Sequence, residues 1–549
     1  MESTPRARRA FACGRRYRGG LAMAASQPMA GNVLASLAES IGTDSVLVDE
    51  ASRALYGQDI SGDANTVTAV VRPSGIADLV ETVLFAAAHE FVLVPRGGGM
   101  SYSGGYVCQR ERTLCMDMAA MGEVLEINAE DMYVTVQAGC TWKTLHEALE
   151  PLGVRTPFWG TLSGLHATVG GSLSQNALFW GSGRHGCAAD SVVGFEIVLA
   201  DGRVLRTGAA ARAGATPFFR HYGPDLTGLF TCDAGALGIK ATATLKLVPV
   251  AEARAGVSMT FSDHGGLFRA MSEVSRQGLA EACFGFDPTL QAQRMKRESL
   301  ARDVKTLGQT VAAQDGVLDK LKTGARVATA GRRFLPEERY SAHFMIEERM
   351  RAAAADAAER IRRIGRDAGG DEVENTIPTV TRAHPFGPLN SMIGPSGERW
   401  LPVHGLVPHS RAIAAYEAIL ALFERNRRRC EDHGIVHGAL FTYADTDCFV
   451  IEPVFYWPDR LNALHRRTVE AQVLHRTNDY PDNAAARTEV MRLRDEVIET
   501  LHAFGAVHLQ IGRLYPFARD LAEPPRDVLR ALKRELDPED RVNPGALGL

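Results

Sequence analysis

Two glycine-rich segments in the N-terminal half carry the residue types best suited to hold a phosphorylated ligand. The first is PRGGGMSYSGG, from Pro95 to Gly105, and an apolar, strand-like run leads into it. Successive glycines permit positive φ and a close approach to the backbone. Such a loop can turn several N–H groups to one side and form a nest for a diphosphate. A tight turn without a ligand is the alternative, because glycine triplets are common in turns.

The second segment, Gly160 to Gly186, reads GTLSGLHATVGGSLSQNALFWGSGRHG. Its last six residues formally match the GxGxxG dinucleotide fingerprint. That fingerprint requires a strand before it and a helix after it. Here the strand-like run SVVGFEIVLADG follows, so we reject a Rossmann fold. The segment predicts a glycine-lined groove of another design, with Ser172 and Asn176 as hydrogen-bonding side chains.

The elements that would position these segments alternate between strand and helix from about residue 65 onward. Helical spacing predicts helices over 74–90 and 141–153. Runs rich in β-branched and apolar residues predict strands over 66–73, 90–96, 114–121, 123–131, 132–139, 191–202 and 241–249. After about residue 251 the chain becomes richer in Arg and Ala, with a helix predicted over 349–365 and apolar segments over 398–408 and 447–459.

Length and composition limit the class of protein. A chain of 549 residues exceeds one compact core, so two or three domains are expected. The net charge of −4 provides no basic excess for nucleic-acid phosphates. Nine scattered cysteines without a CxxC predict no metal site, and they suit a reducing, cytoplasmic location. No apolar run approaches 18 residues, so no membrane span is expected.

The first 30 residues are rich in Arg and small residues. A twin-arginine export signal is one interpretation, but Arg15, Arg16 and Arg18 interrupt the apolar region that such a signal requires. We expect residues 1–40 to be a disordered tail, with Met23 or Met29 as alternative starts of the chain.

Four ordered motifs, PRGGGMSYSGG, ATVGGSLSQNA, EIVLADGRVLRTG and DLTGLFTCDAGALGIKATATLKL, resemble the FAD domain of the vanillyl alcohol oxidase / p-cresol methylhydroxylase (PCMH) superfamily. The resemblance covers about residues 66–250, and LKRELDPEDRVNPGAL resembles that superfamily's C-terminal return to the flavin. It implies an α+β fold in which two subdomains hold FAD beneath an α+β cap. The expected domains are the FAD domain at 41–250, the cap at 251–500 and the returning segment at 501–549.

The resemblance also implies roles for individual residues. The pyrophosphate would lie on the first loop, the second segment would line the other side and approach the flavin ring, and the last residues would contact the adenine or ribose end or return to the ring. The residues concerned are Arg96, Gly97, Gly98, Gly99, Met100, Ser101, Thr168, Gly170, Gly171, Ser172, Asn176, Gly181, Gly183, Gly186, Gly238, Ile239 and Asn543. Many relatives attach FAD through a histidine where this chain has Met100, so noncovalent FAD is expected.

The first substrate class that the resemblance implies is a 2-hydroxy acid, as in D-lactate dehydrogenases and the glycolate oxidase flavin subunit. Histidine suits the base that removes the hydroxyl proton, and His508 lies in a stretch similar to the catalytic-histidine loop of those enzymes. A planar cation suits the carboxylate, and Arg513 and Arg382 are the candidates. The metal motif HxGDGNLH that many of them carry is absent.

The alternative substrate is a para-substituted phenol, with Tyr102 holding the phenolate oxygen. In that branch the acid near the flavin aligns with Cys187, which cannot replace a carboxylate. A flavin-binding protein without turnover is a third reading, which the intact loops disfavour. The electron acceptor could be oxygen, a quinone, a cytochrome or another flavoprotein, and a homodimer is compatible with the sequence.

Overall fold

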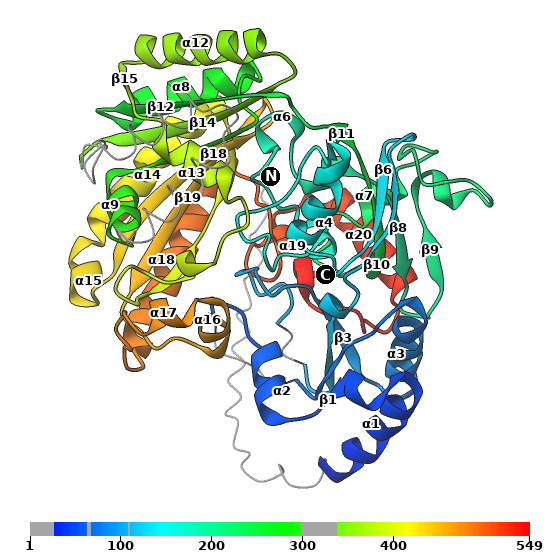
Figure 1. The fold of residues 1–549 in the computed structure, drawn as a ribbon. Helices are drawn as coiled ribbons and strands as arrows, with labels where there is room; N and C mark the ends of the chain where they lie inside the picture. The colour runs from blue at the N-terminus through cyan, green and yellow to red at the C-terminus, as the bar shows by residue number, and fades with distance from the viewer. Residues whose placement is uncertain (1–26, 63–66, 108–109, 298–337) are drawn as a thin grey trace, which may run out of the picture.

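The computed structural model describes residues 27–62, 67–107, 110–297 and 338–549. They form an α+β fold in which the N-terminal sheets lie beside a large sheet formed by the later part of the chain (Figure 1). The N-terminal residues 1–26, part of the tail expected to be disordered, lie outside the described residues.

The first sheet carries the glycine triplet at the end of one strand. Its strands, in the order β1–β2–β4–β3, are β1 (Val46–Leu47), β2 (Ala69–Val71), β3 (Val92–Arg96) and β4 (Thr113–Asp117). Strands β2 and β3 both run parallel to β4, and helix α3 (Ile76–Ala88) connects β2 to β3. Because β3 ends at Arg96, the glycines follow at the carboxyl end of a parallel strand, where ligands commonly bind.

Helix α1 (Gln27–Ile41) occupies residues that the sequence analysis assigned to a disordered tail. Leu34 and Leu37 are buried in the same apolar cluster as Leu79 and Val83 of α3. Their three-residue spacing places both leucines on one face, so burial stabilises this helix. The helix α2 (Glu50–Tyr56) follows, capped by the Asp49 side chain.

The second sheet is antiparallel, in the order β5–β6–β10–β8–β9. Its strands are β5 (Val124–Asn128), β6 (Tyr133–Gln137), β8 (Val192–Val198), β9 (Val204–Arg206) and β10 (Ile239–Lys246), and β7 (Val154–Arg155) pairs separately with β11 (Val248–Pro249). The second glycine segment crosses between β7 and β8 and includes two short helices. The helices of this region are α4 (Trp142–Leu149), α5 (Val169–Gln175), α6 (Ser182–His185) and α7 (Leu226–Leu229).

The third sheet is the largest, in the order β15–β12–β14–β13–β18–β19–β16 with β17 also paired to β19. Its strands are β12 (Ala253–Phe261), β13 (Ala282–Phe286), β14 (Tyr340–Glu348), β15 (Gly370–Val373), β16 (Arg399–Pro402), β17 (Gly405–Pro408), β18 (Val436–Ala444) and β19 (Cys448–Trp457). We call this the cap sheet. Strand β12, the first of these along the chain, begins just after β11 ends at Pro249.

The two faces of the cap sheet pack differently. The helices that accompany it are α8 (His264–Arg276), α9 (Pro288–Arg297), α12 (Arg351–Asp367), α13 (Thr376–Ala383), α14 (Ala412–Arg425), α15 (Arg427–Asp432), α16 (Ala463–Thr468), α17 (Ala471–Leu474) and α18 (Ala484–His502). Buried residues of α8, α12, α14 and α18 share one core with one face of the sheet. On the other face, Phe284 and Tyr456 cluster with Trp159 and Trp180 of the second glycine segment.

The last residues return to the first sheet. After α19 (Phe517–Asp520) and α20 (Glu523–Leu536), Val542 forms a parallel bridge with Leu93 of β3.

The short 3-10 helices are η1 (Thr43–Ser45), η2 (Met118–Ala120), η3 (Glu150–Leu152), η4 (Ala188–Ser191), η5 (Gly208–Ala211), η6 (Asn390–Met392), η7 (His409–Arg411) and η8 (Ala546–Gly548). Among the described helices, none has both the length and the apolar composition needed to cross a bilayer.

Candidate active site

A long pocket lies between the glycine-rich loops and the cap sheet. Its cavity volume is about 300 Å³, within the range of roughly 300–1,000 Å³ that is usual for small-molecule pockets. Loops within 95–106, 161–179 and 234–240 line one end. The cap end is lined by Arg294, Leu389, Ser391, Met392, Trp400, His404, Leu440, Thr442, Val450 and Glu452, together with Leu509 and Gln510.

The first loop presents unpaired backbone amides to this pocket. In the described structure, the N–H groups from Gly97 to Tyr102 donate no hydrogen bond to a protein acceptor. Buried amides are almost always paired, so a run of unpaired ones indicates an acceptor from outside the protein. The oxygens of a pyrophosphate provide such acceptors and favour a backbone nest. The loop therefore fits the diphosphate of FAD.

The two glycine segments touch so closely that side chains would separate them. A Cβ on Gly98 would overlap the carbonyl oxygen of His166, and one on Gly97 would overlap the Thr168 hydroxyl. Gly99 has a φ of 73°, a left-handed conformation that favours glycine. These glycines are required by the geometry of the loop.

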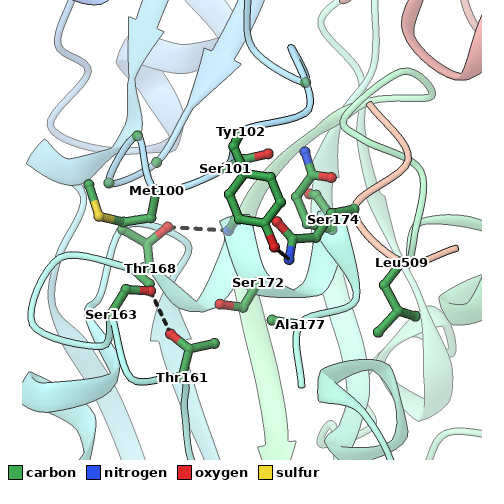
Figure 2. Close-up of a pocket in the computed structure, with 18 of the residues that line it drawn as sticks. Met100, Ser101, Tyr102, Thr161, Ser163, Thr168, Ser172, Ser174, Ala177 and Leu509 are labelled. Carbon is green, nitrogen blue, oxygen red and sulfur yellow. Dashed lines mark hydrogen bonds between the residues drawn. The ribbon is translucent and has the colours of Figure 1, made fainter. Parts of the chain in front are cut away.

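Hydroxyl groups hold the second segment in shape and join it to α4 (Figure 2). Thr168 caps α5, and its Oγ1 accepts a hydrogen bond from the Gly171 amide at 3.2 Å. The Ser172 hydroxyl accepts one from the Trp142 indole at 2.8 Å, and those of Thr161 and Ser163 lie 2.9 Å apart. In Figure 2, Thr168 lies beside Met100, Ser163 and Thr161 lie below it, and Ser172 lies below the Tyr102 ring.

The pocket brings together most of the residues that the sequence predicts for the cofactor. Those that line it are Arg96, Gly97, Gly98, Gly99, Met100, Ser101, Thr168, Gly170, Gly171, Ser172 and Gly238. Asn176, Gly181, Gly183, Gly186, Ile239 and Asn543 are not lining residues.

Local packing explains the other glycines. Gly181 has a φ of 87° and would overlap the Pro157 carbonyl if it carried a Cβ. The Gly183 amide donates to the Glu281 carbonyl at 2.8 Å, which joins this turn to the cap sheet. Gly186, with a φ of 72°, turns against Asp190. The glycines of GSGRHG thus form a tight turn that contacts the cap.

Asn176 and Ile239 also hold the surrounding structure. Asn176 ends α5 in a left-handed conformation, and its Oδ1 accepts from the Ala189 amide at 3.1 Å. Ile239 is fully buried in the core at the start of β10.

Asn543 and Arg513 tie the returning segment to the pocket wall. The Asn543 amide nitrogen donates to the carbonyls of Gly105 and Ala234, at 2.8 and 2.6 Å. The Arg513 guanidinium donates to Asn543 Oδ1 at 2.7 Å and to the Gly104 carbonyl at 2.7 Å. Both side chains position residues that line the pocket or adjoin them, and their polar atoms are used in doing so.

His508 lies outside the set of residues that line the pocket. Its Nδ1 lies 2.7 Å from the His404 carbonyl, its Nε2 lies 2.8 Å from His502 Nε2, and its ring stacks on Tyr515. Burial lowers the pKa of His508 to about 4. Because both ring nitrogens contact other residues, His508 holds the backbone at His404, between β16 and β17, in place.

Arg382 is also engaged away from the pocket. Its guanidinium pairs with Glu347 at 2.6 Å and lies over the Trp159 ring, 4.4 Å from the centroid. These contacts belong to the interface between the cap sheet and the second glycine segment.

Tyr102, in contrast, lines the pocket where the first loop meets Trp400 of the cap. Its hydroxyl accepts a hydrogen bond from Gln510 Nε2 at 3.2 Å, and its ring meets Trp400 edge-on, with centroids 5.8 Å apart. Burial raises the pKa of the Tyr102 phenol well above its ordinary value. The group is therefore a neutral hydrogen-bond donor or acceptor at neutral pH.

Polar groups of the cap complete the pocket. Burial raises the pKa of Glu452 to about 7, with Arg294 acting in the opposite direction. In the described residues, three lining side chains keep a buried nitrogen without a hydrogen-bond partner, namely Arg96 Nε, Arg294 Nε and Trp400 Nε1, and Gln175 keeps a buried oxygen without one. Unsatisfied polar atoms along one pocket are consistent with a bound ligand.

Neither Arg294 nor Glu452 is among the site residues that the sequence predicts. One signal was available, because Glu452 is the single acid within the apolar run CFVIEPVFYW. Across the described residues, no group of three or more His, Cys, Asp and Glu side chains could hold a metal ion.

Comparison with known proteins agrees with this geometry. A family model described as an FAD binding domain matches residues 67–208. The chain contains an FAD-binding domain. The glycolate oxidase subunit GlcD of Bacillus subtilis is 28% identical over 243 residues, covering 44% of this chain and 50% of that protein. A probable mitochondrial D-lactate dehydrogenase of Danio rerio is 30% identical over 230 residues, covering 42% and 45%.

The chain spans about half the length of these curated relatives. Two solved structures share the fold over nearly the whole chain. The 4-ethylphenol oxidase of Gulosibacter chungangensis has a TM-score of 0.69 at 19% identity, covering 96% of this chain and 98% of that one. A p-cresol methylhydroxylase has a TM-score of 0.70 at 16% identity, with the same coverage. The α+β fold, the superfamily resemblance and FAD as the cofactor are thereby confirmed.

Proposed function

We propose that this protein is an FAD-dependent oxidoreductase that oxidises the alcohol carbon of a small 2-hydroxy acid similar to D-lactate or glycolate. The observation that carries the proposal is the continuity of the pocket, which joins the unpaired amides of the first loop to a carboxyl and a guanidinium of the cap. Bound FAD would supply a two-electron acceptor for the hydrogen that leaves carbon.

The side chains divide this work between the two ends of the pocket. The amides of Gly97 to Ser101 would hold the pyrophosphate. Arg294 presents a guanidinium, the group best matched to a carboxylate. Glu452 presents a carboxyl group that can take up a proton near neutral pH. We assign the base to Glu452 and the carboxylate-binding cation to Arg294. His508, Arg513 and Arg382, the candidates from the sequence, already use their polar atoms in contacts within the protein.

A para-substituted phenol is the second candidate substrate. It is favoured by the aromatic wall that Tyr102 and Trp400 form at the cap end of the pocket. The Tyr102 hydroxyl could donate a hydrogen bond to a phenolate oxygen.

We also propose that FAD is held without a covalent bond at the first loop, since a Met100 thioether replaces the histidine that links FAD in many relatives. A reducing, cytoplasmic location is proposed because the seven cysteines that the structure describes are all free thiols.

Anaerobic mixing with substrate tests the proposed function. The holoenzyme is expected to lose its flavin absorbance with D-lactate or glycolate, and a slower or absent response is expected with 4-hydroxybenzyl alcohol. Bleaching by the phenol alone would transfer the assignment to the second candidate. A flavin that none of the three reduces would contradict both.

A further inference from the structure

One face of the β18–β19 hairpin lines the pocket, and the other is buried in the cap core. Leu440 is paired with Glu452 and Thr442 with Val450, and all four residues line the pocket. The intervening residues Phe441, Tyr443, Phe449 and Ile451 belong to the core on the other face. Side chains alternate between the faces of a strand, so the register places the Glu452 carboxyl on the pocket face.

Within the described residues, the carboxyl group of Glu452 makes no hydrogen bond or ion pair with the protein, although its backbone is paired in the β18–β19 ladder. The charged and titratable groups around it come from separate elements: Arg294 from α9, Tyr102 from the first loop and Tyr515 from the returning segment. Burial raises the pKa of both phenols, so the two tyrosines remain neutral near pH 7. Glu452 is thus the acid of this end of the pocket that can exchange a proton with a ligand.

We propose that Glu452 is the general base of the reaction, taking the hydroxyl proton of the substrate while Arg294 binds the substrate's anionic group. The inference rests on the proposed function. The substrate O–H bond breaks, and its proton moves to a Glu452 carboxylate oxygen. Bound FAD would supply the two-electron acceptor for the C–H hydrogen, which leaves carbon with its bonding electron pair, and the C–O single bond becomes a carbonyl.

The protonation of Glu452 sets the expected pH dependence. A base must be ionised to act, and its rate falls tenfold for each pH unit below its pKa. The rate of flavin reduction should therefore rise with pH and level off above about 7, since burial raises the pKa of Glu452 to about 7. A histidine with a pKa near 4, such as His508, would give a rate that is constant from pH 5.5 upward.

The test compares the wild type with Glu452→Gln and Glu452→Asp. Rates of anaerobic flavin reduction by the substrate that bleaches the wild type are measured from pH 5.5 to 9. We expect Glu452→Gln to lose roughly 10²–10⁴ in rate, which is the usual contribution of general base catalysis, together with the rise between pH 6 and 7. Glu452→Asp should retain a pH-dependent rise. Asp447→Asn, at the exposed turn of the same hairpin, is the matched control and should match the wild type.

Two further measurements separate a chemical role from a structural one. The flavin spectrum and FAD content of Glu452→Gln should match those of the wild type. Its affinity for pyruvate, a 2-oxo acid that has no hydroxyl group to oxidise, should also be unchanged. A wild type that no substrate bleaches would remove the proposed function. A wild type that bleaches, beside a Glu452→Gln variant with the same rate and pH profile, would overturn only the role of Glu452.

Discussion

At the scale of single residues, the cofactor end of the site depends on the absence of side chains. Gly98 shows this most clearly, because its Cα lies against the backbone of the second glycine segment at His166. An alanine there must push backbone away from backbone, which no rotamer change can relieve. The unpaired amides on either side of Gly98 would then no longer point toward the same ligand.

Gly98→Ala is therefore predicted to weaken FAD binding by at least tenfold, measured by titrating apoprotein with FAD and following the flavin fluorescence. Gly75→Ala is the control, since a Cβ at Gly75 meets nothing within 4 Å and its φ of −168° suits any residue. An unchanged affinity in Gly98→Ala would show that the first loop does not hold the cofactor.

The sequence predicts the cofactor end of the site better than the substrate end. Residues 96–101 and 168–172 are contiguous, so residue type alone indicates a loop with exposed amides. Arg294 and Glu452 are more than 150 positions apart, and only the register of the cap sheet brings them to one pocket. The contacts of His508 are hidden from the sequence for a similar reason, because the carbonyl and imidazole that engage its ring come from other segments.

At the scale of elements, long periodic runs predict their structure well. The helices expected over 74–90 and 141–153 appear as α3 and α4, and the strand over 447–459 appears as β19. The strand-like segment 398–408 is two strands, β16 and β17, which pair with successive parts of β19. The break at Val403 and His404 turns His404 into the pocket, and no local pattern signals it.

A buried lysine of α20 holds the C-terminal returning segment in place. Lys533 of α20 donates to the carbonyls of Ala236 and Val542, at 2.9 and 2.8 Å, and pairs with Asp537 at 2.6 Å. Asp537 has a side chain that is 1% exposed, so it could not be hydrated if Lys533 were lost. Breaking a buried pair by removing one partner costs about 3–5 kcal/mol.

Lys533→Met is accordingly predicted to lower the free energy of unfolding by about 3–5 kcal/mol and to weaken FAD binding, because Ala234 and Gly105 lose their support through Asn543. Urea denaturation of the holoprotein measures the first effect. Arg530→Met, an exposed position on the same helix, should stay within about 0.5 kcal/mol of the wild type. Equal stabilities of the two variants would refute this role of Lys533.

At the scale of the whole molecule, a buried charge cluster joins the cap sheet to the N-terminal sheets. Arg155 of β7 contacts Glu281 at 2.9 Å and Glu347 of β14 at 3.3 Å. The indole of Trp159 donates to Glu281 at 2.7 Å, and Arg382 pairs with Glu347. All of these carboxylates are buried, so the cluster aligns the two walls of the pocket.

Arg155→Met should leave Glu281 and Glu347 as buried neighbours of like charge. We predict a loss of about 3–5 kcal/mol in stability and two thermal transitions by calorimetry in place of one, as the cap unfolds separately. Arg206→Met removes an exposed pair with Glu196 and should change stability by about 1 kcal/mol or less. A single, unshifted transition in Arg155→Met would contradict a joining role for the cluster.

The central claim is that unpaired backbone amides after β3 bind the phosphates of FAD and so bring a flavin into this polypeptide. Its most direct test is the FAD content of the purified protein, determined from its absorbance before and after acid precipitation. We expect about one FAD per chain, released into the supernatant by acid because no covalent bond holds it at Met100. A folded, colourless protein that takes up no added FAD would contradict it.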